Sequence, residues 1–278
     1  MRAARGMRLI GAFMSLSALF ACASTSSLTM SAALNVSFDE QPVNAVITSP
    51  RVTGSASGAI VSSTLTLNGG RATSHAGVPG SGQSMRLPTY ARLSYTTPLA
   101  VVSIRNKAGT TDPLDPGSKR FIFRADFSLD DTSGNAPTNS DGDNLFQRGL
   151  SPHTQWRLSV DGHQARCSVK TAGSSARVQT PAITIPRKTT NSSWYRAVCL
   201  RDTDSAATLS LTVYRYDVAA RAWKLVQSTR VRGAGGSLTM NRAIPISIGG
   251  KLNNSNTIQR GAPDQFNGLV DNVSLIIG

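Results

Sequence analysis

The chain has 278 residues, with 29 lysines and arginines against 15 acidic residues, and therefore a formal net charge of +14. Glu40 is the single glutamate, and all other acidic residues are aspartates. Because glycosidases and most other general acid–base enzymes hold two carboxylates, or a carboxylate and a histidine, in one shielded cleft, this composition disfavours such an enzyme. The positive charge is spread along the chain without a Lys/Arg block, which disfavours a specific nucleic-acid site and favours attraction to anionic polymers or surfaces.

The first 23 residues predict a signal peptide, because three arginines precede an apolar run at residues 9–21 that is too short to span a bilayer. The run ends in Leu19-Phe20-Ala21-Cys22, which resembles a bacterial lipobox. In that case Cys22 is lipidated, and the lipid is the only membrane contact that we expect. Cleavage after Ala23 or after Ala33 is the alternative and releases the protein. Both routes predict an extracellular or cell-surface location.

Residues 24–33 are rich in serine, threonine and alanine, and we interpret them as a polar tether. Residues 34–278 form short runs of alternating apolar and polar residues, broken by Gly, Pro, Asn and Asp, with no helical periodicity. This pattern predicts one all-β domain. So many short strands in one domain imply two stacked antiparallel sheets.

The clearest strand is at residues 120–129, where Phe121, Phe123, Ala125 and Phe127 share one face. Residues 156–160 and 165–169 alternate in the same way on either side of Asp161-Gly162, which predicts a hairpin with a tight turn. Further strands are expected at residues 194–200, 208–216 and 223–229.

Four segments resemble the laminin G-like branch of the concanavalin A-like lectin/glucanase superfamily, in its bacterial secreted form. They are residues 144–149 (NLFQRG), 155–167, 194–201, and 246–250 followed by 266–273 (FNGLVDNV). The resemblance implies a jelly-roll sandwich over residues 34–278. Tyr195 stands where the family often has a histidine, and residues 132–143 form a long insertion. Ligand specificity does not transfer with the resemblance, because loops set it.

Three cysteines are present, and assigning Cys22 to the signal segment leaves Cys167 and Cys199 to pair. Both also match cysteine positions of the family-like segments. The bridge would close a loop of roughly 33 residues and stabilise the fold by about 3–4 kcal/mol. It would join neighbouring strands of one sheet or span the two sheets. Two buried free thiols are the alternative.

Calcium is the one cofactor that the sequence suggests, because oxygen-rich loops suit a hard cation. Asp271 lies in the family-like last strand, and Asp39 follows the first strand. In sandwiches of this shape the first and last strands often meet, so we expect this pair to hold a structural calcium ion. The alternative is that Asp271 only accepts backbone hydrogen bonds. A second acidic loop at residues 141–144, with Asp130 or Asp131, is more typical of a flexible surface loop.

Carbohydrate recognition would use aromatic faces and amide side chains. Trp223 follows a turn, and we expect it to be exposed together with Tyr216 or Tyr214. Asn253 and Asn254 begin a polar loop before the last strand, where family members often place ligand contacts. A plain surface loop is the alternative for the asparagines.

The sequence therefore predicts an exported, non-catalytic binding module that recognises an extracellular glycan, a cell-wall polymer or a surface protein. Some relatives of the fold are glycanases with two glutamates and an aspartate on one strand, and this chain has no such run. A polysaccharide hydrolase that uses two distant aspartates is one alternative. A structural adhesion protein of the cell wall is the other.

Overall fold

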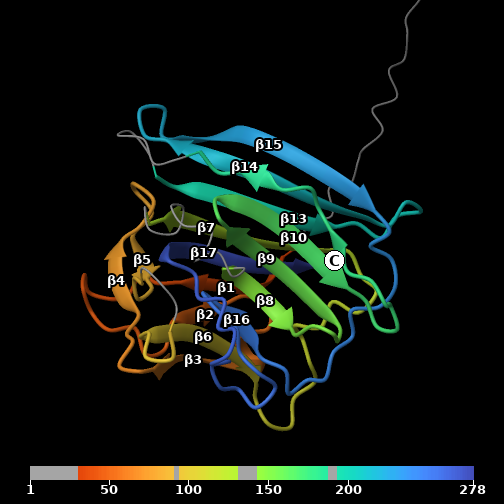
Figure 1. Ribbon diagram of the computed structural model, residues 1–278, viewed down its shortest axis with the longest axis horizontal. Helices are drawn as coiled ribbons and strands as arrows, with labels where there is room; N and C mark the ends of the chain where they lie inside the picture. The colour runs from red at the N-terminus through yellow and green to blue at the C-terminus, as the bar shows by residue number, and fades with distance from the viewer. Residues whose placement is uncertain (1–30, 91–93, 131–142, 187–192) are drawn as a thin grey trace, which may run out of the picture.

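The computed structural model describes residues 31–90, 94–130, 143–186 and 193–278, which fold into two antiparallel β-sheets stacked face to face (Figure 1). This confirms the predicted all-β sandwich. The predicted signal peptide, Cys22 and most of the predicted tether lie outside the described residues. The first strand begins at Ala32, so the last two residues of the predicted tether belong to the sandwich.

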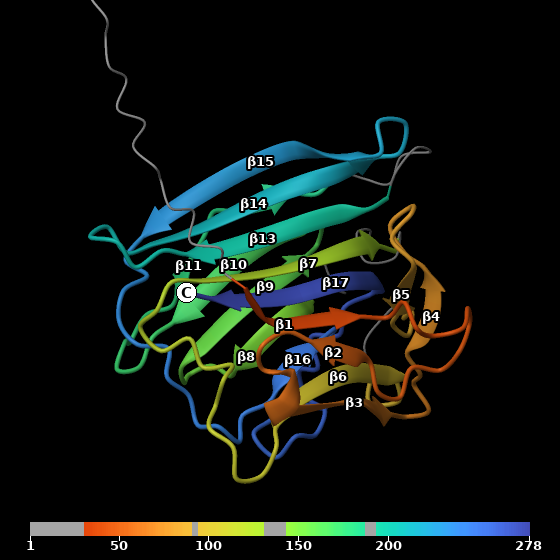
Figure 2. The same ribbon diagram turned by 180° about the vertical axis from the view of Figure 1, so that it is seen from behind.

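Sheet A runs in the order β15-β14-β13-β7-β17-β1-β2, with β5 paired to β17 and β4 paired to β5 (Figure 2). Its strands are β1 (Ala32–Ser37), β2 (Arg51–Thr53), β4 (Thr73–Ala76), β5 (Gln83–Arg86), β7 (Phe121–Leu129), β13 (Tyr195–Arg201), β14 (Thr208–Asp217), β15 (Ala222–Arg232) and β17 (Gly268–Ile277). The first and last strands, β1 and β17, are neighbours as expected.

Sheet B runs in the order β11-β10-β9-β8-β16-β6-β3, with β12 paired to β10. Its strands are β3 (Ile60–Leu67), β6 (Leu99–Asn106), β8 (Asn144–Gly149), β9 (Gln155–Asp161), β10 (Gln164–Lys170), β11 (Val178–Gln179), β12 (Ile183–Thr184) and β16 (Ile246–Ile248). One 3₁₀ turn, η1 (Ser57–Ala59), precedes β3. Among the described residues, no helix has the length and apolar character needed to cross a membrane.

The core between the sheets is built on the aromatic face that the alternation predicts. Phe121, Phe123 and Phe127 of β7 are all fully buried. Trp156 of β9 packs against Phe121 and Phe123 from the opposite sheet, with its ring centroid 5.0 Å from that of Phe123. It also packs against Phe146 of its own sheet, with the ring centroids 4.9 Å apart. Aromatic side chains bury 150–250 Å² each, on the order of 4–6 kcal/mol of transfer free energy, so this cluster holds the two sheets together.

The predicted hairpin is formed by β9 and β10, with Trp156 opposite Val169 and Val160 opposite Ala165. Its turn lies one residue later than expected. Asp161 pairs with Gln164, and the two central residues are Gly162 and His163, with φ of 53° and 65°. A two-residue turn with both φ values positive matches the right-handed twist of the strands that it connects.

Cys167 of β10 and Cys199 of β13 form the predicted disulfide, with their Cα atoms 5.9 Å apart. Since β10 belongs to sheet B and β13 to sheet A, the bridge spans the two sheets. Both cysteines are fully buried in the main core. The bond therefore crosslinks the sandwich through its interior.

Replacing both cysteines with alanine should lower the free energy of unfolding by about 3–4 kcal/mol, because the bridge restricts the unfolded chain. Denaturant unfolding of the oxidised protein and of the variant measures the difference. The reduced wild-type protein serves as the control, since it loses the bond without losing core volume. Equal midpoints for the oxidised and reduced wild type would contradict this role.

Candidate functional site

A bulge in β17 shapes the site at which two predicted calcium ligands lie. β17 pairs with β1 through residues 273–276 and with β5 through Leu269 and Val270, so Asp271 lies between the two partners. Opposite, the register of β17 against β7 shifts between Asp271 and Ser274, and Asn272 has φ of 46°. A bulge re-aims side chains locally, and here Asn272 donates from Nδ2 to Oδ2 of Asp126 at 3.0 Å.

Asp39 and Asp271 both lie against the turn at residues 77–82 that joins β4 to β5. Asp39 Oδ1 accepts the backbone N–H of Gln83 at 2.9 Å. A Cβ at Gly77 would lie 2.7 Å from Asp271 Oδ2, and one at Gly82 would lie 2.2 Å from Asp39 Oδ1. Only glycine therefore allows the turn to approach both carboxyl groups, and the structure brings together the two aspartates that the sequence singled out.

Asp271 is a fully buried carboxyl group. Its pKa is raised to about 7, mainly by burial and in addition by the carboxylates of Asp126 and Asp39, while the backbone N–H of Asn272 and the Ser81 hydroxyl act to lower the pKa. The hydrogen bonds are from Asn272 N–H to Oδ1 at 2.7 Å and from Ser81 Oγ to Oδ2 at 3.3 Å. Both carboxyl oxygens of Asp271 are thus held by hydrogen bonds, but the charged groups that act on this carboxyl group are the carboxylates of Asp126 and Asp39.

The donor set is chemically suited to calcium, which takes six to eight hard oxygen ligands. Asp39, Asp271 and the Ser81 hydroxyl supply such oxygens, and the excess negative charge at Asp271 is what a cation would offset. Within the described part of the chain, however, no group of three or more His, Cys, Asp or Glu side chains could share a metal ion. Backbone carbonyls or water would have to complete the shell, which fits a weak site.

The second acidic loop predicted from the sequence lies partly at residues 131–142, outside the described residues. Its described members have other partners. Asp130 forms an ion pair with Arg86 at 2.6 Å, and Asp143 Oδ1 accepts the Tyr90 hydroxyl at 3.2 Å.

Tyr216 and Trp223 pack on each other next to the Asp271 region. Tyr216 is only 7% exposed and donates its hydroxyl to the Pro79 carbonyl at 3.1 Å. The expected exposure of Tyr216 is therefore wrong. Trp223 is half-buried, with its ring centroid 5.3 Å from that of Tyr216. The Arg196 guanidinium lies 4.2 Å from the Trp223 ring centroid. Arg196 also binds Asp126 through two hydrogen bonds of 2.6 and 2.7 Å, so one face of the indole is already occupied.

Asn253 and Asn254 lie in the loop between β16 and β17, at the opposite end of the molecule from β15 and Trp223 (Figures 1 and 2). Asn253 lines an open pocket of about 610 Å³ beside β3, and Asn254 lines one of about 430 Å³ beside Arg105 and Arg242. The Asn253 side chain caps its own turn, accepting the N–H groups of Ser255 and Thr257, both at 3.0 Å. These asparagines do not form one site with Trp223.

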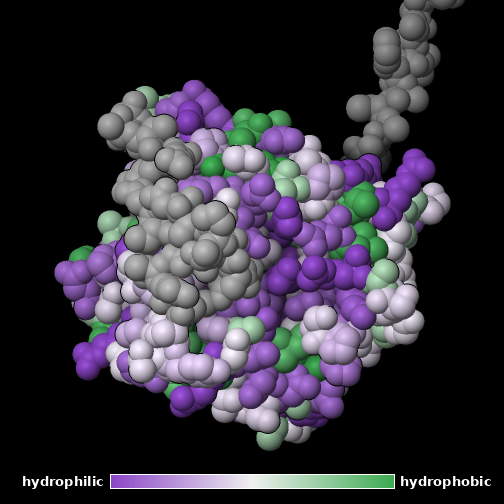
Figure 3. Space-filling model, in the orientation of Figure 1, coloured by the Kyte–Doolittle hydropathy of each residue, from purple (hydrophilic) through white to green (hydrophobic). Residues whose placement is uncertain are grey.

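A third site, which the sequence analysis did not identify, crosses the outer face of sheet B. Cross-strand neighbours in one row are all polar and come from five adjacent strands. They are Ser168 of β10, Arg157 of β9, Gln147 of β8, Ser247 of β16 and Ser103 of β6. Hydrophilic side chains gather at the centre of this side of the molecule (Figure 3).

The side chains of this polar row are largely buried, yet several of their atoms have no partner. Gln147 and Ser168 are 1% and 2% exposed. Gln147 Oε1, Arg157 Nε, Ser168 Oγ and Arg166 Nε have no hydrogen-bond partner. A buried polar atom without a partner costs about 1–3 kcal/mol. Four of the twelve such atoms among the described residues lie in or beside this row. The alternation in β8, β9 and β10 was the available signal, but alone it predicts only solvent-facing residues.

A carboxylate lies at the edge of the polar row. Asp264 is 3% exposed, and burial raises its pKa, while Lys251, Arg157 and Asn144 lower it. Its Oδ2 lies 2.6 Å from Lys251 Nζ and accepts from Asn144 Nδ2 at 3.1 Å. These contacts leave Asp264 neutralised and fixed in place.

Comparison with known proteins adds information on the fold. No family model matches the chain, and no curated protein matches it. The solved structure of the binding domain of Paraclostridial Mosquitocidal Protein 1 is similar in fold, with a TM-score of 0.54 and 8% sequence identity over 88% of this chain. The botulinum neurotoxin serotype G binding domain has a TM-score of 0.46 and 10% identity. This chain spans about half the length of those structures, 48% and 47%. The match to the mosquitocidal domain supports the β-sandwich fold, and the laminin G-like assignment stays a prediction.

In the absence of calcium, Asp271 should make the protein less stable as the pH rises. The pKa of Asp271 is raised from 3.8 when unfolded to about 7 when folded, so between these values the folded state binds more protons and stability falls with increasing pH. Between pH 5 and pH 8 the wild type should lose roughly 2–3 kcal/mol relative to Asp271→Asn, which stays neutral. Chemical unfolding in chelator at both pH values tests this. Asp204→Asn, at a half-exposed side chain, is the control, and parallel pH profiles for wild type and Asp271→Asn would contradict the prediction.

Proposed function

We propose that this chain is an exported, non-catalytic binding module and that the outer face of sheet B is its ligand-binding surface. The observation that carries the proposal is the polar row with its buried, unpartnered atoms. The row offers an acceptor at Gln147 Oε1, a donor at Arg157 Nε and a hydroxyl at Ser168 that can do either. Sugar hydroxyl groups also donate and accept, so an extracellular glycan or a cell-wall polymer satisfies such a row.

Binding is favoured over catalysis by the state of the carboxyl groups. Hydrolysis of a glycosidic bond needs two carboxyl groups about 5–9 Å apart that face the substrate. Asp126 and Asp271 interact with each other but have no exposed surface. Asp264, next to the polar row, is held by Lys251. The mosquitocidal structure is described as a binding domain, which is the same class, although a shared fold alone does not define function.

Calcium enters the proposal as a structural ion held by Asp39 and Asp271. It would offset the charge of a buried carboxylate and tie the turn at residues 77–82 to the end of β1. Its site lies on sheet A, remote from the polar row, so calcium would stabilise the fold without contacting the ligand. Export through the signal segment, with or without a lipid on Cys22, would place the module where calcium and glycans are available.

An adhesive role is the second candidate, favoured by the net charge of +14. A domain that is held to an anionic wall by dispersed charge would lose binding steeply as ionic strength rises. Binding through the polar row depends on short hydrogen bonds and would persist in salt.

The binding surface can be tested with a glycan array, probed once in calcium and once in chelator. We expect at least one glycan class to bind in both buffers. On the best array ligand, Gln147→Ala and Ser168→Ala should each weaken binding about 5- to 30-fold, as expected for the loss of one hydrogen bond of about 1–2 kcal/mol. Ser210→Ala, a serine-to-alanine substitution on the opposite sheet, is the matched control for Ser168→Ala. An array that is negative in both buffers, or an equal loss with Ser210→Ala, would contradict the proposal.

The calcium site can be tested separately by thermal unfolding. Millimolar calcium should raise the melting temperature of the wild type by a few degrees, as expected for a weak extracellular-type site. Asp39→Asn should abolish the shift, because it removes one of the two ligand carboxylates. Magnesium at the same concentration is the control for ionic strength. A melting temperature that does not respond to calcium would exclude this ion.

A further inference from the structure

Three arginines gather at one end of the polar row. Arg157 of β9 lies opposite Ser168, and Arg166 of β10 lies opposite Ser159, so the two arginines occupy diagonal positions on the outer face of sheet B. Arg177 approaches from the segment just before β11 and is exposed. Diagonal neighbours in an antiparallel pair are within reach of long side chains, and like charges there destabilise the sheet.

The electrostatics of Arg157 show how poorly this cluster is compensated. Burial lowers its pKa first and Arg177 lowers it next; Asp264 and Asp161 raise it, and Arg166 lowers it again. The ion pair with Asp264 is long, 3.9 Å, and Asp264 is already bound by Lys251 at 2.6 Å. Among the described residues, the charges that act on Arg157 or on Asp264 are those of the cations Arg157, Arg166, Arg177 and Lys251 and of the anions Asp161 and Asp264. Within this set, positive charge exceeds negative charge.

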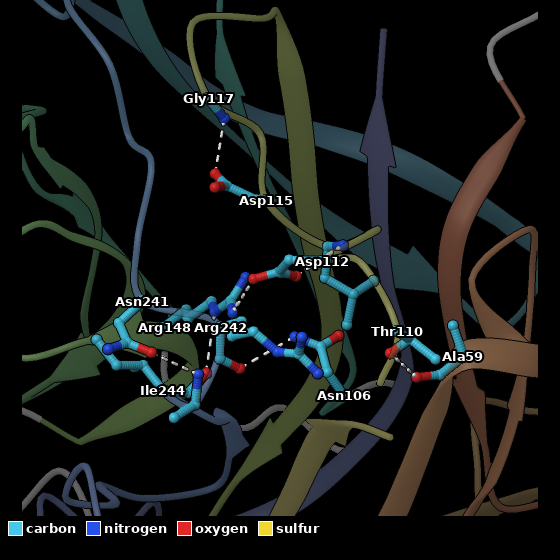
Figure 4. A network of polar contacts seen from close by, with 12 residues as sticks. Ala59, Asn106, Thr110, Asp112, Asp115, Gly117, Arg148, Asn241, Arg242 and Ile244 are labelled. Carbon is cyan, nitrogen blue, oxygen red and sulfur yellow. Dashed lines mark hydrogen bonds and ion pairs between the residues drawn. The ribbon is translucent and has the colours of Figure 1, made fainter. Parts of the chain in front are cut away.

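Two buried arginines of this protein, Arg148 and Arg201, differ from Arg157 and Arg166 in having a hydrogen-bond partner for Nε. Arg148 of β8, 2% exposed, donates from Nη1 and Nη2 to the carboxylate of Asp112 at 3.2 and 2.5 Å and from Nε to the Ile244 carbonyl at 3.1 Å (Figure 4). Arg201 donates to the carbonyl groups of four residues, Gly117, Lys119, Ala234 and Gly236. Structural arginines in this fold thus use Nε, whereas Arg157 and Arg166 leave it without a partner.

A guanidinium group with a free Nε–H binds a carboxylate or sulfate by two parallel hydrogen bonds, one from Nε and one from an Nη. Gln147 and Ser168 are the direct cross-strand neighbours of Arg157 on either side. An acidic group bound at Arg157 would therefore place the adjoining sugar hydroxyls beside Gln147 Oε1 and Ser168 Oγ. One molecule of this kind would give partners to Arg157 Nε, Gln147 Oε1 and Ser168 Oγ.

We propose that the polar row takes an anionic saccharide, and that Arg157 and Arg166 bind its carboxylate or sulfate group while Gln147 and Ser168 bind the neighbouring hydroxyls. This inference rests on the proposed function and narrows it to acidic glycans. Charge attraction from Arg177 at the exposed rim would speed association.

Matched ligand pairs test the inference. The probes are an oligogalacturonate with its methyl ester and a heparin-derived oligosaccharide with its desulfated form, titrated by calorimetry at physiological salt. At least one acidic probe should bind tenfold or more tightly than its neutral counterpart. Arg157→Gln should remove most of that preference and Arg166→Gln part of it. Arg157→Lys should restore little, since it keeps the charge but not the two parallel hydrogen bonds. Arg232→Gln, an exposed arginine of β15, is the control for net charge, and thermal unfolding checks that each variant folds.

The outcomes separate this inference from the function on which it rests. If glycans bind through Gln147 and Ser168 but no acidic probe is preferred over its neutral counterpart, the inference is overturned and the binding module stands. An acid preference that Arg232→Gln reduces as much as Arg157→Gln also overturns it, because net charge would then explain the preference. If no glycan binds at all, the proposed function fails first.

Discussion

The alternation of side chains along antiparallel strands is the constraint on which the rest of this molecule depends. Trp156 enters the core from β9, so its neighbour Arg157 must point to the outer face. The same register that sets Trp156 against Phe123 and Phe146 also aligns the polar row across five strands. A slip of one residue would move both sets to the wrong side, and the disulfide between the sheets opposes such a slip at β10.

Charged side chains are compensated differently on the outer faces of the two sheets. On sheet A, Asp126 is fully buried but is compensated by two hydrogen bonds from Arg196 and one from Asn272, and Arg196 is covered in turn by Trp223. That network is complete, so it stabilises one arrangement. On sheet B, the buried atoms Arg157 Nε and Gln147 Oε1 have no hydrogen-bond partner. Under the proposed function, a bound ligand would complete this network.

The bulge at Asn272 places a buried carboxyl group of sheet A close to two other carboxyl groups. Because β1 and β5 share one edge of β17, the residue between them has no strand partner on that side, and Asp271 occupies this place. Its carboxyl group is oriented by a backbone N–H and a hydroxyl but faces Asp39 and Asp126. Proton uptake and calcium binding are two ways of removing the same charge, so pH and calcium would act on one element of the fold.

How much was predictable from the sequence follows from how local each signal is. The period of two along β7 and β9 identified the core face, the hairpin and the all-β class, and the cysteine count identified the bridge. The proximity of Asp39 and Asp271 was also predictable, because it follows from the meeting of the first and last strands. The calcium ligation and the glycan contacts at Trp223, Asn253 and Asn254 remain predictions.

The amino-acid sequence by itself determined which residues alternate, which of them are apolar and which cysteines can pair, because these properties belong to single strands. Only the tertiary structure decided that Gln147, Arg157 and Ser168 lie in one row, that Tyr216 is covered and that Arg196 stacks on Trp223. The physical reason is that the burial and partners of an outer-face side chain depend on neighbouring strands and covering loops that are distant in sequence. The alternation of apolar and polar residues within one strand therefore does not determine this burial or these partners.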